Sequence, residues 1–277
     1  MNRNFTLGIY LPALVLLTAF FSCSRENDPG PRNPDQPPPV NGKLLRFLTW
    51  SEGVEATAAL HYSEDSALQY IAYVTPAQYK DTTFFDYGEA GVQTIWNKRS
   101  GEIAEYIYYP SGKVKDALLS DYWTTAFTQL HYNYAGNGKL ADLTYYRVTD
   151  GQKKLQWRSV YFYGNDQLPT HIVSTDFNNH SIRYDFEAYT PACSYNPFVL
   201  IQTTDLAPLY EIYNQPFLQE LGGRLPAKIN KSAGGQVEMI IENTYTMNDR
   251  HPVKSEVRTS YPGHPEYNGG YNLDFAY

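Results

Sequence analysis

The sequence predicts an all-β fold, an antiparallel β-meander of about 12–14 strands that is curved or partly closed, as in a half-barrel. Alternating apolar and charged residues predict the strands, and a recurring tyrosine predicts how they are joined. In "SIRYDFEA", Ile182, Tyr184, Phe186 and Ala188 alternate with charged residues, as in a strand with one buried face. The segments "QVEMIIENTYTM" and "PVKSEVRTSY" show a similar alternation, which is typical of antiparallel sheet with one face in solvent.

A tyrosine ends each predicted unit of the meander. The chain has 26 tyrosines, and five of them are followed by turn-forming residues and then by an aliphatic residue: Tyr62, Tyr87, Tyr109, Tyr134 and Tyr163. Their spacing of 22 to 29 residues fits one two-stranded hairpin per unit. Because a hairpin cannot bury its apolar face alone, we expect a serial meander in which Tyr109, Tyr134 and Tyr163 are equivalent, largely buried positions.

The start of the chain has the layout of a secretory signal. "MNRNFTLGIYLPALVLLTAFFS" contains one arginine, then an apolar run, then a small residue. The run is short for a membrane span and contains Pro12. Cys23, directly after it, resembles the lipidation site of bacterial lipoproteins. The resemblance implies a signal peptide over residues 1–22 and a lipid on Cys23 that holds the protein on a membrane surface. An ordinary signal peptide and a retained anchor helix are the alternatives.

Residues 23–42 are predicted to form a tether between the lipid and a single folded domain over 43–277. "SRENDPGPRNPDQPPPVNG" is rich in proline and polar residues and cannot form a core. In polyproline geometry, at about 3.1 Å per residue, it reaches on the order of 60 Å. Ser24 after the cysteine resembles lipoproteins sorted to the outer membrane, so we expect a lipid-anchored outer-membrane protein, on either the cell-surface or the periplasmic face.

The repeat also supports a resemblance to known families. The order of tyrosine, turn and aliphatic residue is similar to the tyrosine-aspartate repeats of large bacterial surface proteins. Together with the lipoprotein start and the segments "YNPFVL" and "LGGRLPAKI", it resembles a family of uncharacterised bacterial lipoprotein domains with a porin-like β fold. The resemblance covers the chain from about Leu44 onward and implies a fold, but no activity.

One segment departs from the strand pattern. "DLAPLYEIYNQPFLQELGG", residues 205–223, spaces its apolar residues at near-helical intervals and ends on two glycines. We expect a short helical insert that covers an open end of the curved sheet or lines a ligand site.

Composition and spacing disfavour several functions. A net charge of -7 disfavours nucleic acid as a partner. The six histidines lack metal-ligand spacing, and no serine lies in a nucleophile-elbow motif, so we predict no enzyme, no cofactor and no metal. The pair Asp185 and Glu187 is expected on a solvated strand face. Cys193, without a second thiol in the folded domain, is expected to be a small buried residue.

Three functions fit this organisation. The first is a non-catalytic binding or structural role in which Trp96, Trp123 and Trp157 present flat rings to a glycan or a surface protein. The alternative is a carrier of lipid or another apolar ligand, with those rings around an apolar interior. A second alternative is a small outer-membrane β-barrel, suggested by the final "YNLDFAY". The charged residues predicted to face outward disfavour a wall in contact with lipid.

Overall fold

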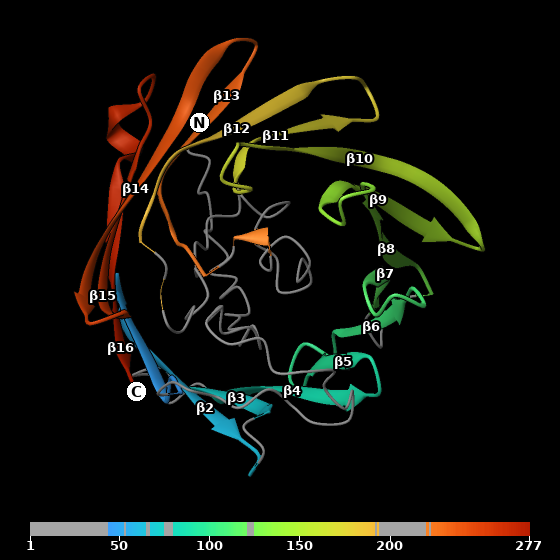
Figure 1. Cartoon of the computed structure of the whole chain (residues 1–277), viewed down its shortest axis with the longest axis horizontal. Coiled ribbons are helices and arrows are strands. Elements are labelled where there is room, and N and C mark those ends of the chain that lie inside the picture. The colour runs from blue at the N-terminus through green and yellow to red at the C-terminus, as the bar shows by residue number, and fades with distance from the viewer. Residues whose placement is uncertain are drawn as a thin grey trace, which may run out of the picture.

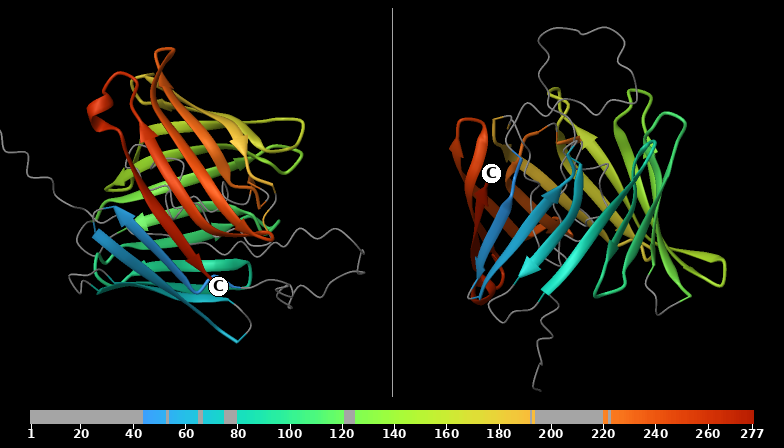
Figure 2. Two further views of the ribbon diagram at one scale, coloured as in Figure 1. Left: turned by 90° about the vertical axis from the view of Figure 1, so that its left-hand side faces the viewer. Right: turned by 90° about the horizontal axis from the view of Figure 1, so that it is seen from below.

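The computed structural model describes residues 44–52, 54–64, 67–74, 80–120, 125–191, 193, 220–221 and 223–277. In this part of the chain sixteen antiparallel strands form a closed barrel, seen end-on in Figure 1. Figure 2 shows that the strands are inclined to the barrel axis, as closure of a sheet requires. The strands are β1 (Phe47–Glu52), β2 (Val54–Tyr62), β3 (Leu68–Val74), β4 (Lys80–Gly88), β5 (Gly91–Asn97), β6 (Ile103–Tyr108), β7 (Val114–Ser120), β8 (Phe127–Tyr134), β9 (Leu140–Thr149), β10 (Gln152–Tyr163), β11 (Pro169–Asp176), β12 (Ser181–Tyr189), β13 (Pro226–Ala233), β14 (Gln236–Asn248), β15 (His251–Ser260) and β16 (Gly269–Ala276).

The predicted all-β antiparallel meander is confirmed. Every strand pairs with its neighbours in sequence, and the described residues contain sixteen strands, more than the 12–14 expected. The first and last strands pair with each other, Phe47 opposite Ala276 and Thr49 opposite Asp274, which closes the ring. Closure leaves none of the sixteen described strands at an open edge of the sheet, where another chain could pair with it and start aggregation.

Side chains alternate between the interior and the outer wall of the barrel. On β12, Tyr184 and Phe186 are 1% and 7% exposed and belong to the core, whereas Arg183 faces outward. The alternation predicted for this segment is therefore correct up to Phe186. Ala188 is exposed, contrary to the prediction, because the register of β12 against β13 shifts between Phe186 and Ala188.

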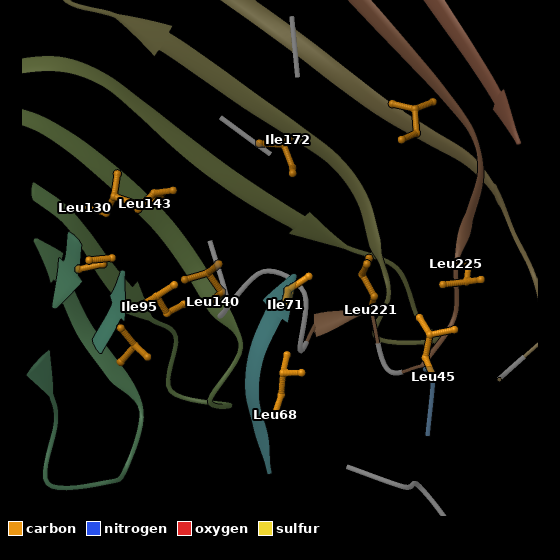
Figure 3. Close-up of a cluster of buried hydrophobic side chains, with 14 of the residues drawn as sticks. Leu45, Leu68, Ile71, Ile95, Leu130, Leu140, Leu143, Ile172, Leu221 and Leu225 are labelled. Carbon is orange, nitrogen blue, oxygen red and sulfur yellow. The ribbon is translucent and has the colours of Figure 1, made fainter. Parts of the chain in front are cut away.

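The core consists of aliphatic and aromatic side chains on the inner wall. Figure 3 shows part of it, contributed by strands far apart in sequence and by residues that precede β1 and β13. Its labelled members are Leu45, Leu68, Ile71, Ile95, Leu130, Leu140, Leu143, Ile172, Leu221 and Leu225.

A ring of tyrosines marks one end of the barrel. The eight hairpins run from β1–β2 to β15–β16. In each of them, a tyrosine on or directly after the second strand donates its hydroxyl hydrogen to a backbone carbonyl within two residues of the start of the first strand. Because the strands alternate in direction, all eight bonds lie at the same end. The pairs are Tyr62–Leu45 (2.9 Å), Tyr87–Leu68 (3.1 Å), Tyr108–Val92 (2.5 Å), Tyr134–Val114 (3.0 Å), Tyr163–Leu140 (2.8 Å), Tyr189–Pro169 (2.6 Å), Tyr245–Pro226 (3.3 Å) and Tyr277–Pro252 (2.9 Å).

A register shift accompanies most of these tyrosines. Seven of the strand pairs join an even-numbered strand to the next strand in the chain, from β2–β3 to β14–β15. In six of them the register shifts at the tyrosine of the ring. In β14–β15 it shifts between Thr246 and Met247, after Tyr245. Such bulges bend a strand and increase its twist. Tyr134 and Tyr163 occupy equivalent positions in this arrangement, but the third position belongs to Tyr108 rather than to Tyr109. Tyr108, Tyr134 and Tyr163 are partly buried and pack against the core.

The connection between β12 and β13 is held together where its ends are described. The Thr190 amide donates to the Leu225 carbonyl and the Cys193 amide to the Gly223 carbonyl, both at 2.9 Å. Cys193 is 8% exposed, and burial raises the pKa of its thiol. Glu220 accepts hydrogen bonds from the Leu140 amide and the Lys139 ammonium group, both at 3.0 Å, and so contacts the β8–β9 turn.

Several predicted segments lie outside the described residues: the signal peptide 1–22, the tether 23–42 with Cys23, and most of the helical insert 205–223. In the described part of the chain, helix is limited to one residue at Glu220 and the 3₁₀ turn η2 (Pro265–Tyr267). No helix found there has the length and hydropathy needed to cross a membrane.

Replacing Tyr163 by phenylalanine removes the hydroxyl that satisfies the Leu140 carbonyl. We expect the free energy of unfolding to fall by about 1–2 kcal/mol, because the carbonyl loses its partner while the ring still packs. Tyr146→Phe is the control, since Tyr146 lies on the outer wall, and it should change stability by less than about 0.5 kcal/mol. Urea unfolding measures both variants, and equal effects would contradict a structural role for the ring of tyrosines.

The barrel should lose stability in alkali. Burial raises the pKa of Tyr108 to about 12, and burial also raises the pKa values of five further tyrosines of the ring. In the unfolded chain they ionise near pH 10. Above that pH the unfolded state releases protons that the folded state retains, so the free energy of unfolding falls by up to about 1.4 kcal/mol per pH unit and tyrosine. Urea unfolding at pH 8.5 and pH 11 tests this, and equal stability would contradict it.

Candidate functional site

Trp96 lies on the outer wall in a ladder of rings. Four neighbouring strands, β2 to β5, place His61, Tyr70, Phe84 and Trp96 directly opposite one another. His61 and Tyr70 stack with their centroids 4.1 Å apart, and Phe84 and Trp96 stack at 4.2 Å. The rings of Tyr70 and Phe84, 5.8 Å apart, connect the two stacks. Cross-strand aromatic pairs of this kind stabilise a sheet.

In each of the two stacks, one face of each ring is covered by the partner ring, so one face of the Trp96 indole packs on Phe84. The indole nitrogen of Trp96 donates to Asp86 Oδ2 at 3.2 Å, so its polar atom also has a partner within the chain.

Trp157 faces the interior. It stacks on Tyr145 with the centroids 3.8 Å apart, and Tyr145 lies opposite Leu130 of the core. The Tyr145 hydroxyl lies 3.1 Å from Thr128 Oγ1. Trp96 and Trp157 are therefore on opposite faces of the wall and are not brought together. Trp123, the third predicted residue, lies outside the described residues.

The outer wall of β7 to β10 carries a polar cluster that sequence reasoning missed. Asp116 lies opposite His131, His131 opposite Thr144, and Thr144 opposite Arg158. The row faces outward, because Ala117, Leu130 and Leu143 on the same strands belong to the core. We define the polar cluster as Tyr109, Asp116, Gln129, His131, Asn133, Asp142, Thr144 and Arg158.

Hydrogen bonds fix both carboxylates of the polar cluster. Asp116 Oδ1 accepts a hydrogen bond from Gln129 Nε2 and pairs with His131 Nδ1, each at 2.7 Å. Asp142 Oδ1 accepts from Asn133 Nδ2, and Asp142 Oδ2 accepts from Arg158 Nη2, each at 3.0 Å.

Tyr109 completes the polar cluster. Its hydroxyl donates to the Tyr132 carbonyl at 3.2 Å, beyond the last described pairing of β7 with β8. Burial raises the pKa of Tyr109, and the carboxylates of Asp116 and Asp142 raise it further. Tyr108 makes the hydrogen bond of the tyrosine ring in this hairpin, so Tyr109 is additional to it.

The carboxylates of the polar cluster are more buried than those of two ion pairs on β12 and β15 of the outer wall. The side chains of Asp116 and Asp142 are 6% and 11% exposed, whereas those of Asp185 and Glu256 are 32% and 45% exposed. Removing a carboxylate from water costs free energy, which the hydrogen bonds to Gln129, His131, Asn133 and Arg158 offset. The result is a preorganised set of donors and acceptors on a rigid wall.

The fold is that of a closed up-and-down β-barrel, the architecture of porin-like proteins. No family model and no curated protein matches the chain. A porin-like protein from Bacteroides uniformis ATCC 8492 superposes with a TM-score of 0.56 at 14% identity, over 84% of this chain and 96% of that one. A porin-like protein from Bacteroides vulgatus ATCC 8482 gives a TM-score of 0.55 at 14% identity, over 84% and 98%. At this identity the likeness shows a porin-like β fold.

Replacing Arg158 by alanine leaves the Asp142 carboxylate without its cation. We expect the free energy of unfolding to fall by about 1–2 kcal/mol, less than for a fully buried pair, because the Arg158 side chain is 55% exposed and water screens the attraction. Arg183→Ala is the control: its pair with Asp185 is exposed, and its loss should cost less than about 0.5 kcal/mol. Equal losses in urea unfolding would contradict a special cost of burying Asp142.

Proposed function

We propose that this chain is a lipid-anchored, non-catalytic binding protein of the outer membrane, held by a lipid on Cys23 and a proline-rich tether. The observation that carries the proposal is the polarity of the barrel wall. Its inner side holds the apolar core together with buried polar residues such as Ser159 and Ser174, and its outer side carries charged residues in ion pairs along β12 to β15.

This polarity is the reverse of that in a barrel that spans a bilayer. Among the described outward residues, Arg183 pairs with Asp185 at 2.7 Å, Arg258 with Glu256 at 2.6 Å, and Lys228 with Glu187 at 2.9 Å. A lysine or arginine facing lipid at the midplane costs about 2–4 kcal/mol. The outer wall of β12 to β15 is therefore suited to water, which favours a barrel held beside the membrane by a tether.

A binding role fits a rigid closed wall with a preorganised polar surface. The polar cluster presents fixed donors and acceptors, and the described residues contain no group of three or more histidine, cysteine, aspartate or glutamate side chains that could hold a metal ion. The expected partners are a glycan or a surface protein, reached by the tether from either the cell-surface or the periplasmic face of the outer membrane.

A second candidate function is a carrier of an apolar ligand. Its basis is the apolar part of the inner wall, to which Ile71, Ile95, Leu143 and Ile241 contribute. Barrels of sixteen strands are wider than their own wall side chains can fill, so an apolar interior in such a barrel suits an apolar occupant.

The anchor is tested by replacing Cys23 with serine in the full chain. We expect the variant to leave the membrane fraction and to lose labelling by an alkyne-modified palmitate, because two or more acyl chains are needed for stable anchoring. Cys193→Ser, at the other cysteine, is the matched control and should remain labelled and membrane-bound. Persistent labelling of the Cys23→Ser protein would contradict the lipid anchor. If the purified Cys23→Ser protein releases bound lipid when it is denatured, the result would favour the second candidate function, a carrier of an apolar ligand.

A further inference from the structure

We propose that the polar cluster on β7 to β10 is a carbohydrate-binding site that takes the ring hydroxyls of a neutral glycan. The inference rests on the proposed binding function and assigns its ligand class and its position. The site lies on the outer face of β7 to β10, whereas Trp157 of β10 faces the interior and Trp96 lies on β5.

Stability alone does not account for the polar cluster. A buried ion pair is often no more stabilising than apolar residues of the same volume, because desolvation offsets the attraction. Burying the Asp116 and Asp142 side chains to 6% and 11% exposure does not make the outer wall more compatible with water, because the exposed pair of Arg183 and Asp185 provides charge there without a desolvation cost. Fixed, poorly hydrated carboxylates are useful where they must accept hydrogen bonds from a ligand.

The polar cluster has acceptors and donors left over. Asp116 uses Oδ1 for both Gln129 and His131, and no partner of its Oδ2 is found among the described residues. His131 pairs through Nδ1 and its side chain is 29% exposed, so its second ring nitrogen is available. Arg158 is 55% exposed and uses one guanidinium nitrogen, which leaves further donors in the same row.

This combination fits adjacent hydroxyls on a sugar ring. Each hydroxyl both donates and accepts, so one can donate to Asp116 Oδ2 or to the free ring nitrogen of His131, while its neighbour accepts from Arg158. Tyr109, half-buried beside the two carboxylates, adds an aromatic ring against which the C–H surface of a sugar can pack. The hydroxyl bond to the Tyr132 carbonyl and an edge-on contact with the Tyr134 ring, 6.3 Å between centroids, hold the Tyr109 ring in place.

Other ligand classes fit less well. The carboxylates of Asp116 and Asp142 repel a phosphate or another anion, and Arg158 beside Asp142 disfavours a cation. An apolar ligand would bury the remaining donors and acceptors without partners, at a cost of about 1–3 kcal/mol for each group. A neutral polyhydroxyl compound satisfies both kinds of group at once.

The test uses the full chain carrying Cys23→Ser and, as probes, soluble α-mannan, dextran, xylan and chitin oligosaccharides in affinity electrophoresis and calorimetry. We expect binding to at least one probe. Asp116→Asn keeps the shape of the side chain but removes its charge, and should weaken binding at least tenfold. His131→Gln is the second variant and should do the same. Asp185→Asn, an equal change in the exposed ion pair, and Trp96→Ala should leave the affinity within twofold. Near-ultraviolet circular dichroism confirms folding of each variant.

Failure to bind any of the four probes would overturn the inference, as would binding that neither Asp116→Asn nor His131→Gln weakens. If binding fails while Cys23→Ser still releases the protein from membranes and cross-linking on cells captures a protein partner, the inference is wrong and the proposed function stands. If a glycan binds but Cys23→Ser remains lipid-labelled, the site stands and the anchor is wrong.

Discussion

The structure depends on one hydrogen bond made eight times, from a tyrosine hydroxyl to a backbone carbonyl at the start of the same hairpin. At six of these tyrosines the strand also carries a register shift. The shift bends the strand, and the hydroxyl satisfies a carbonyl near the bend. Repeating the same bend around the sheet curves it steadily, and steady curvature allows β1 to meet β16.

Closure separates the chemistry of the two faces of the wall. Because residues alternate along each strand, the apolar core lies inside, and the outer wall carries ion pairs and polar groups as well as aromatic rings. The outer wall is not uniform: β2 to β5 carry stacked aromatic rings, β7 to β10 the polar cluster, and β12 to β15 exposed ion pairs. Specific binding would therefore depend on which part of the circumference faces a partner.

The fold class could be predicted because its signals are local. Alternation in β12 and the tyrosine spacing both lie within a few tens of residues. Closure depends on the pairing of Phe47 with Ala276, which no local pattern shows. The polar cluster escaped prediction because Asp116, His131 and Asp142 meet only through the register of separate strands. The bulge between Leu155 and Trp157 turns Trp157 inward, and a bulge is not visible in an alternation pattern.

The order of strands around the ring has a kinetic consequence. Every pairing but one joins strands that are consecutive in the chain, so hairpins can form and add to one another by short loop closures. The pairing of β1 with β16 joins the two ends of the domain and carries the largest loop entropy. Pairing of β1 with β16 would therefore be the late, slow step of folding. Until these strands pair, both would expose open edges, and exposed strand edges promote aggregation during folding.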